Sequence, residues 1–181
     1  MQITFKLDET NYLHHQLFFA SQSPTIRKRR FRAKFVFPIV YVLLGIFLYF
    51  FKAPVMGYIF GGIGILWFFL YPIYEKGAYI KSYKKFIREN FQNTVDKAIT
   101  LQIEDNYFIL KDDGNEAKIN LSELQEIAEI PGEILIKIGN GNSIIIPKNQ
   151  VAELTNLENR LEEIAERLQI DYLDYSQWTW K

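Results

Sequence analysis

Two long uncharged stretches dominate the pattern of apolar and polar positions. Residues 35–51 read FVFPIVYVLLGIFLYFF, and residues 55–74 read VMGYIFGGIGILWFFLYPIY. A helix needs about 20 apolar residues to cross a hydrocarbon core of about 30 Å. The second stretch reaches that length, and the first gains from the apolar stem of Lys34. The short connection between them allows only a tight antiparallel turn, and Pro54 suits the first turn of a helix. The pattern therefore predicts a transmembrane hairpin over 35–74, with helices at 35–51 and 55–74.

Three other structures compete with this hairpin. A pair of buried helices in a soluble fold would carry a polar face, and neither stretch has one. A signal peptide would be followed by a small-residue cleavage site, and none follows the first stretch. A re-entrant loop is an alternative for the shorter stretch.

The segment before the hairpin, residues 1–34, is predicted to hold a strand, a helix and a basic juxtamembrane segment. Residues 2–7 alternate apolar and polar side chains, which is typical of a strand. Residues 9–22 carry apolar side chains at helical spacing. His14 and His15, the only histidines, would point about 100° apart on that helix, which disfavours a shared metal site. We expect both at the surface or an interface.

After the hairpin the period of the pattern changes twice. Residues 75–93 predict an amphipathic continuation of the second helix, which would emerge from the bilayer and rest on its surface. From residue 94 onward, short strands follow at roughly ten-residue spacing, with hairpin signals at Asp113-Gly114 and Asn140-Gly141. Residues 124–130 look less regular. The spacing favours an antiparallel, meander-like sheet over alternating strands and helices.

A last helix is predicted after Pro147. Its leucines recur at helical spacing from Leu154 to Leu168, which gives an apolar stripe that would pack on the sheet. Its other face is acidic and includes a candidate partner-binding group formed by Glu158, Glu162 and Glu163. The folded domain would cover 94–170. The aromatic tail at 171–181 is either packed or free to bind a partner or an interface.

Charge is divided between the two halves of the chain. Residues 1–93 hold 13 basic and 4 acidic side chains, a net charge of +9, whereas residues 94–181 hold 8 and 17, a net charge of −9. The basic residues flank the hairpin, so the positive-inside rule places both termini in the cytoplasm. The same cations either only set this orientation or also contact anionic lipid head groups. The candidates are Arg27, Lys28, Arg29, Arg30, Arg32, Lys34, Lys81, Lys84 and Lys85.

Glycines leave one side of the second predicted helix without bulky side chains. Gly57 and Gly61 have GxxxG spacing, which allows two helix backbones to approach closely. They either pack against the first helix near Gly45 or mediate dimerisation.

Composition removes several classes of function. The 181 residues include no Cys, which excludes disulfides and thiolate metal sites. No nucleophile–base pattern and no phosphate-binding loop is recognisable. We therefore expect no enzyme activity, no cofactor and no metal site, and the basic run beside an apolar helix does not favour nucleic acid.

The layout resembles the bacterial YcxB-like membrane proteins. The matching residues are Ile119-Asn-Leu-Ser-Glu-Leu124, Glu126-Ile-Ala-Glu129, and Ile146-Pro-Lys148 before the last helix. The resemblance implies an N-terminal strand and helix, two transmembrane helices, and a cytoplasmic module like a pleckstrin-homology (PH) domain. It implies no catalytic residues.

These observations give one expected function and two alternatives. We expect an α+β protein of the bacterial inner membrane, in which a transmembrane hairpin anchors a PH-like sheet, capped by a C-terminal helix, as a binding or scaffolding module. Its partners would be the bilayer and either a protein or a second copy. The alternatives are a small accessory subunit that assembles through its hairpin, and a sensor of anionic lipid.

Overall fold

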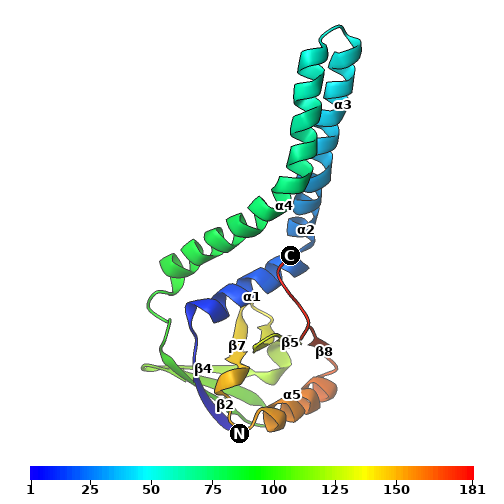
Figure 1. Cartoon of the computed structure of the whole chain (residues 1–181). Coiled ribbons are helices and arrows are strands. Elements are labelled where there is room, and N and C mark those ends of the chain that lie inside the picture. Colours follow the sequence, from blue (N-terminus) through cyan, green and yellow to red (C-terminus); the bar gives the residue numbers. More distant parts are fainter. The chain divides into compact units, whose positions relative to one another are not determined.

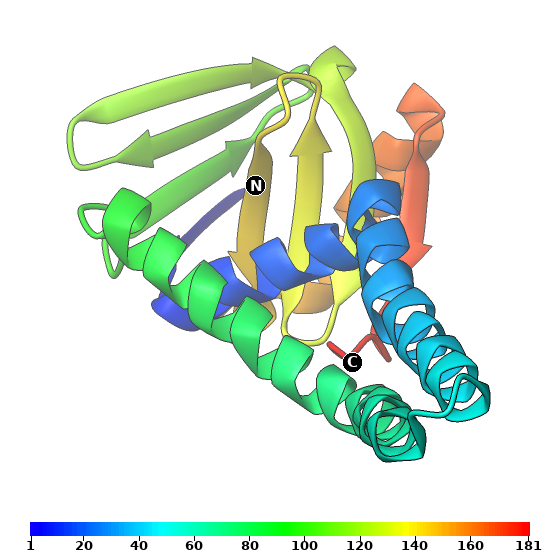
Figure 2. The same cartoon turned by 90° about the horizontal axis from the view of Figure 1, so that it is seen from above.

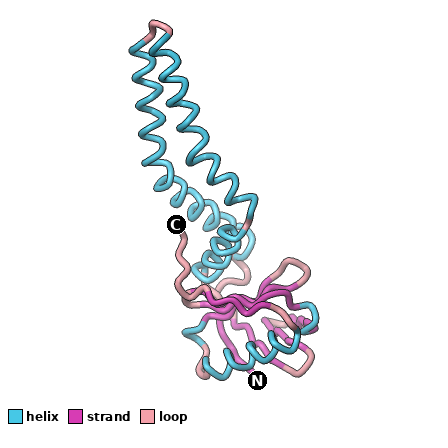
Figure 3. The backbone as a smooth tube through the Cα atoms, turned by 90° about the vertical axis from the view of Figure 1, so that its right-hand side faces the viewer, coloured by secondary structure: helices cyan, strands magenta, loops and turns pink.

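The computed structural model describes residues 1–181 and is an α+β fold with two four-stranded sheets and two long apolar helices (Figure 3). The chain divides into two compact units. The sheet unit contains Met1–His15 and Phe86–Thr179. The hairpin unit contains Gln16–Lys85 and Trp180–Lys181.

The sheet unit contains two sheets, one complete helix and the ends of two others. The first sheet is antiparallel in the order β1-β2-β3-β4, with bounds Gln2–Lys6, Ala98–Ile103, Tyr107–Asp112 and Asn115–Asn120. The second has the order β7-β6-β5-β8, with bounds Ser143–Pro147, Glu133–Ile138, Leu124–Ile130 and Asp171–Asp174. The 3₁₀ turns η2 (Leu121–Glu123) and η3 (Lys148–Gln150) precede β5 and follow β7. Figure 2 shows the two sheets side by side, with β1 next to β7.

The core of this unit forms between the sheets and α5 (Leu154–Leu168). α5 buries the stripe that its leucine spacing predicts, including Leu157, Leu161 and Ile164. Alternate residues of the strands supply the opposite side, among them Phe108, Ile127 and Ile136. Three tight turns contain a glycine with positive φ, and two of them are the hairpin signals around Gly114 and Gly141. Glycine adopts this conformation without steric cost.

Three features differ from the expected organisation of the chain. The first is the N-terminal strand, which we expected within a separate segment 1–34. β1 instead pairs along its whole length with β2, from Gln2 opposite Gln102 to Lys6 opposite Ala98. The hairpin is thus inserted between two neighbouring strands of one sheet, so residues 1–15 belong with the predicted domain 94–170.

The second is residues 124–130, which we expected to be irregular and which form the buried strand β5. A β-bulge shifts the register between Leu124 and Glu126, and a bulge interrupts the two-residue alternation by which strands are recognised. The third is the predicted tail 171–181, whose first residues form β8, parallel to β5. The sheet is therefore not a simple antiparallel meander.

The segment 75–93 continues the second hairpin helix, as expected. Both belong to α4, one helix of 38 residues from Pro54 to Phe91. Pro54 begins this helix, as predicted. Pro72 lies inside it and removes one backbone hydrogen bond without ending the helix. Figure 1 shows that α4 changes direction between its first half, which lies in the hairpin, and its second half.

The remaining helices lead into the hairpin. α1 (Glu9–Gln22) is followed by α2 (Pro24–Phe31), a π-helical turn η1 (Arg32–Val36) and α3 (Phe37–Phe50). By length and composition, the continuous helix Pro24–Phe50 and α4 are both long and apolar enough to cross a membrane. Most of their large apolar side chains are exposed, including Ile39, Leu43 and Phe69.

Candidate functional site

Most of the predicted lipid-contact residues lie at one end of the hairpin unit. We define the hairpin base as α2, η1 and residues 71–85 of α4. Arg27, Lys28, Arg29 and Arg32 are exposed there, and Lys34 is half-buried. Lys81, Lys84 and Lys85 are exposed further along α4. At about 1.5 Å per residue, Lys84 lies about 14 Å along the helix from Glu75. The cations therefore form two groups, one on α2 and η1 and one on α4.

Arg30 differs from the other predicted cations because it is enclosed. Its Nε lies 3.2 Å from Oε2 of Glu75, whose side chain is only 7% exposed. Its Nη2 donates a hydrogen bond of 2.5 Å to the backbone carbonyl of Lys181. Its guanidinium carbon lies 4.6 Å from the ring centre of Trp180 and 5.8 Å from that of Tyr79. Arg30 is thus held by an ion pair, a carbonyl and two aromatic rings rather than presented to a ligand.

Trp180 completes this cluster. Its side chain is buried, and its ring meets that of Tyr79 edge to face at 5.5 Å. Tyr71 donates a hydrogen bond to Glu75 from the same helix. For Trp180, the packed alternative that we left open for the aromatic tail describes the structure. Trp180 and Lys181 therefore pack against the hairpin base.

The glycines lie where α3 and α4 approach each other. A Cβ atom on Gly45 would lie 2.7 Å from the carbonyl oxygen of Gly57 and 2.7 Å from the amide nitrogen of Gly61. A Cβ atom on Gly57 would lie 2.8 Å from the carbonyl oxygen of Gly45. Gly64 makes a further close approach, 2.8 Å from the carbonyl oxygen of Pro38. A Cβ atom on Gly61 itself would meet no atom within 4 Å. The close approaches at Gly45, Gly57 and Gly64 are therefore contacts between α3 and α4 within the hairpin.

The three glutamates of the predicted partner face do not act together. Glu163 forms an ion pair with Arg160 at 3.0 Å, and Arg160 also contacts Asp105. Glu158 and Glu162 instead lie on the side of α5 near Tyr172 of β8. Burial and the nearby charges of Glu129, Glu158 and Glu162 raise the pKa of Tyr172. Only Glu158 and Glu162 remain as an acidic pair without an ion-pair partner.

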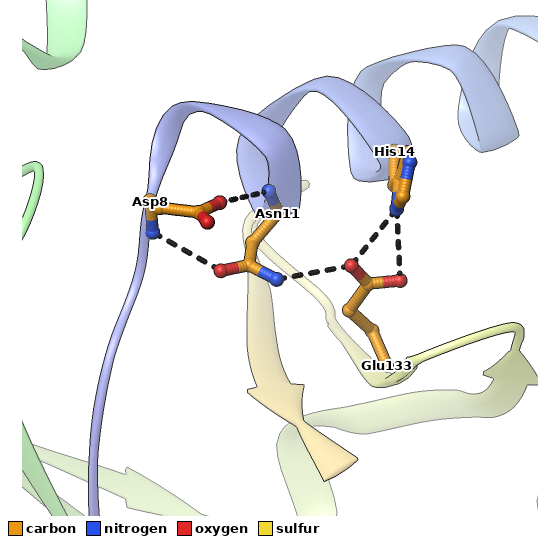
Figure 4. Close-up of polar contacts among 4 residues, drawn as sticks. All are labelled: Asp8, Asn11, His14 and Glu133. Atoms are coloured by element: carbon orange, nitrogen blue, oxygen red, sulfur yellow. Dashed lines mark hydrogen bonds and ion pairs between the residues drawn. The ribbon is translucent and has the colours of Figure 1, made fainter. Parts of the chain in front are cut away.

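A polar network joins α1 to the start of β6 within the sheet unit (Figure 4). Asp8 and Asn11 bond to each other's backbone amides at 2.8 and 3.0 Å, which caps α1. Asn11 Nδ2 donates to Oε1 of Glu133, and Nδ1 of His14 lies 2.9 Å from the same oxygen. Glu133 is 2% exposed. Its buried carboxylate therefore depends on these two α1 side chains.

The pKa values of the two histidines shift in opposite directions. The hydrogen bond to Glu133 raises the pKa of His14 above 6.5. Burial lowers the pKa of its neighbour His15 from 6.5 to about 4. Both histidines are thus half-buried, in different environments.

These shifts predict a two-sided pH dependence of stability. The contribution of His14 is complete below pH 6.5 and is lost as the pH rises through its raised pKa. The contribution of His15 is complete above pH 6.5 and is lost as the pH falls towards about 4. Thermal unfolding of His14→Gln should therefore lose pH dependence only on the alkaline side, and that of His15→Gln only on the acidic side. Identical pH profiles for both variants would contradict this assignment.

No family model, curated protein or solved structure matches this chain. The functional assignment therefore depends on the geometry of the chain itself.

Sequence reasoning missed Glu75 at the hairpin base and left the role of Trp180 open. One signal for Glu75 was present, because it is the only acidic residue between Glu9 and Glu89 and stands among cations. No sequence signal paired it with Arg30, 45 positions earlier.

Proposed function

We propose that this chain is a membrane-anchored binding module, with the hairpin in the bilayer and the sheet unit at the cytoplasmic face. The observation that carries the proposal is the exposure of the hairpin. Phe50, Val55 and Ile73 are each at least 69% exposed. Soluble monomers rarely present such a contiguous apolar surface to water. A bilayer would cover it, whereas a core helix of a soluble protein would already be buried.

The charges support one orientation. The exposed cations of α2 and η1, together with those of α4, flank the ends of the helices that lie away from the turn. Only Lys52 lies at the turn. Because cytoplasmic flanks carry the excess of Lys and Arg, the turn would lie outside and both termini inside. In a bacterium this is the inner membrane.

The topology of the sheet unit supports the PH-like assignment. Four antiparallel strands are followed by three more and then by an amphipathic helix, with β8 as an addition. This arrangement is consistent with the resemblance to YcxB-like proteins. PH-like modules act as binding platforms, so we assign binding rather than catalysis.

Two surfaces of the sheet unit could receive a protein partner. β4 is an edge strand whose residues are largely exposed, and it could be extended by a strand from a partner. The acidic pair Glu158 and Glu162 on α5 offers charge complementarity to a basic partner.

Site-specific photocrosslinking in cells tests which part binds. A photoreactive residue at Glu162 should give a defined protein adduct, and Glu158→Lys in the same chain should reduce that adduct because the partner face would lose its charge complementarity. A photoreactive residue at Ile59, which is 48% exposed on the hairpin, should label lipid. The opposite pattern, with protein adducts only from Ile59, would favour the alternative of an accessory subunit that assembles through its hairpin.

A further inference from the structure

An apolar groove of about 330 Å³ lies between α3 and α4. Its lining includes Phe35, Pro38, Ile39, Leu43, Gly64 and Phe68. The close approach of Gly64 to the backbone of Pro38 brings the two helices together along the groove. The rings of Phe35 and Phe68 meet at 5.8 Å and mark the end nearest the hairpin base. All of the lining side chains are apolar, so the groove suits a hydrocarbon chain.

A cation stands at that end of the groove. Lys34 directly precedes Phe35, and its Nζ lies 5.2 Å from the centre of the Phe35 ring. Lys34 is half-buried and has no carboxylate partner, in contrast to Arg30. Positive charge therefore adjoins one end of an apolar groove.

The backbone is irregular at this position. Phe37 N–H donates to the carbonyl of Arg32, which is the i→i+5 bond of a π-helical turn. Such turns are rare and are often found at functional sites. The turn contains both Lys34 and Phe35, so the cation and the first groove residue come from the same irregular segment.

We propose that the groove and Lys34 form a binding site for one anionic phospholipid. An acyl chain would lie along the groove, and the phosphate would contact Lys34. This inference rests on the proposed insertion of the hairpin in a membrane. It extends that proposal by assigning a ligand class to a defined place on the hairpin.

A second copy of the chain fits the groove less well. A symmetric dimer with parallel membrane orientation would bring the cations of both copies to the same depth near a two-fold axis. Like charges close together oppose association. An anionic lipid supplies the missing negative charge together with the apolar chain.

The test uses the full chain purified in a mild detergent and native mass spectrometry with added phosphatidylglycerol or phosphatidylcholine. We expect one phosphatidylglycerol per chain to be retained in preference to phosphatidylcholine. Lys34→Gln should weaken retention about fivefold, from the contribution of a single cation near anionic lipid. Ile39→Trp should abolish it by filling the groove. Leu43→Phe provides a milder filling variant if tryptophan disturbs folding.

Two matched control variants distinguish binding at this site from a general attraction of anionic lipid to the basic residues. Val40→Trp changes a residue that is 55% exposed and does not line the groove, and Lys28→Gln removes an exposed cation elsewhere in α2. Both should retain the lipid as the unchanged chain does. Equal retention of the two lipids, or equal effects of the groove variants and their controls, would overturn the inference.

Flotation with vesicles of phosphatidylcholine alone distinguishes the two levels of the proposal. A chain that floats but shows no preference for phosphatidylglycerol would contradict only the lipid site. A chain that fails to float would contradict insertion of the hairpin and with it the proposed function.

Discussion

Glu75→Ala is expected to destabilise the hairpin base more than any other single change considered. It would leave the guanidinium of Arg30, whose side chain is 23% exposed, without a carboxylate and against the ring of Trp180. Removal of one partner of a buried ion pair typically costs about 3–5 kcal/mol. Because Arg30 is partly exposed, we expect about 2–4 kcal/mol here. SDS-induced unfolding of the full chain in detergent micelles measures this loss.

Trp180 provides a local reporter of the same event. In a background of Trp67→Phe and Trp178→Phe it is the only tryptophan. Its fluorescence should shift to longer wavelength when Trp180 leaves its buried contacts with Arg30 and Tyr79. Lys76→Ala, which removes an exposed charge beside Glu75, is the matched control and should change little. The double variant with Arg30→Met and Glu75→Leu should recover much of the stability, since it leaves no unpaired charge. If Glu75→Ala unfolded no earlier than Lys76→Ala, the cluster would not stabilise the base.

Gly57→Ala is expected to separate the hairpin helices. Its Cβ atom would lie 2.8 Å from the carbonyl oxygen of Gly45 and 3.0 Å from Cβ of Tyr49. The nearest atom belongs to backbone, so the helices must move apart. Overpacking of this kind costs about 1–3 kcal/mol. Gly45→Ala should behave alike, because it meets the same crossing from the other side. Far-ultraviolet circular dichroism during SDS titration follows the loss.

Gly62→Ala is the control for this crossing, since its Cβ atom would meet nothing within 4 Å. It should leave stability unchanged or raise it slightly through helix propensity. The comparison also separates packing within the hairpin from dimerisation through GxxxG. If Gly62→Ala were as damaging as Gly57→Ala, the exposed face of α4 would be in contact with another chain and the assignment would be wrong.

The hairpin helices and α5 were predictable because their signals are local. The uncharged stretches, the position of Pro54 and the leucine spacing of α5 each depend on neighbours within a few turns. The hairpin signals at Gly114 and Gly141 are local as well, and both turns have the positive φ that glycine favours.

What could not be predicted depends on contacts between distant positions. β1 finds its partner about 100 residues later, in β2, and nothing in six N-terminal residues indicates which strand that is. β8 is only 4 residues long and begins and ends with aspartate, so its pairing depends on the support of β5. The bulge in β5 interrupts the alternation of apolar and polar residues. This strand, whose side chains are mostly buried, was therefore not recognisable from the sequence.

The same distinction between local signals and contacts between distant positions applies to the candidate site. The basic residues and the glycines were recognisable as groups, but their separate roles come from tertiary contacts. Arg30 has the same sequence context as Arg29, yet Glu75 and Trp180 enclose only Arg30. Glu163 likewise resembles Glu162 in sequence, and only its pairing with Arg160 distinguishes it.

Cysteine labelling in intact cells tests the central claim, that the hairpin anchors the sheet unit at the cytoplasmic face, most directly. The chain has no cysteine of its own, so Lys52→Cys at the turn and Asp113→Cys in the sheet unit each give a single reactive site. A maleimide that does not cross the inner membrane should label Lys52→Cys in intact cells and Asp113→Cys only after permeabilisation. Labelling of Asp113→Cys in intact cells, or recovery of either variant in the soluble fraction, would contradict the account.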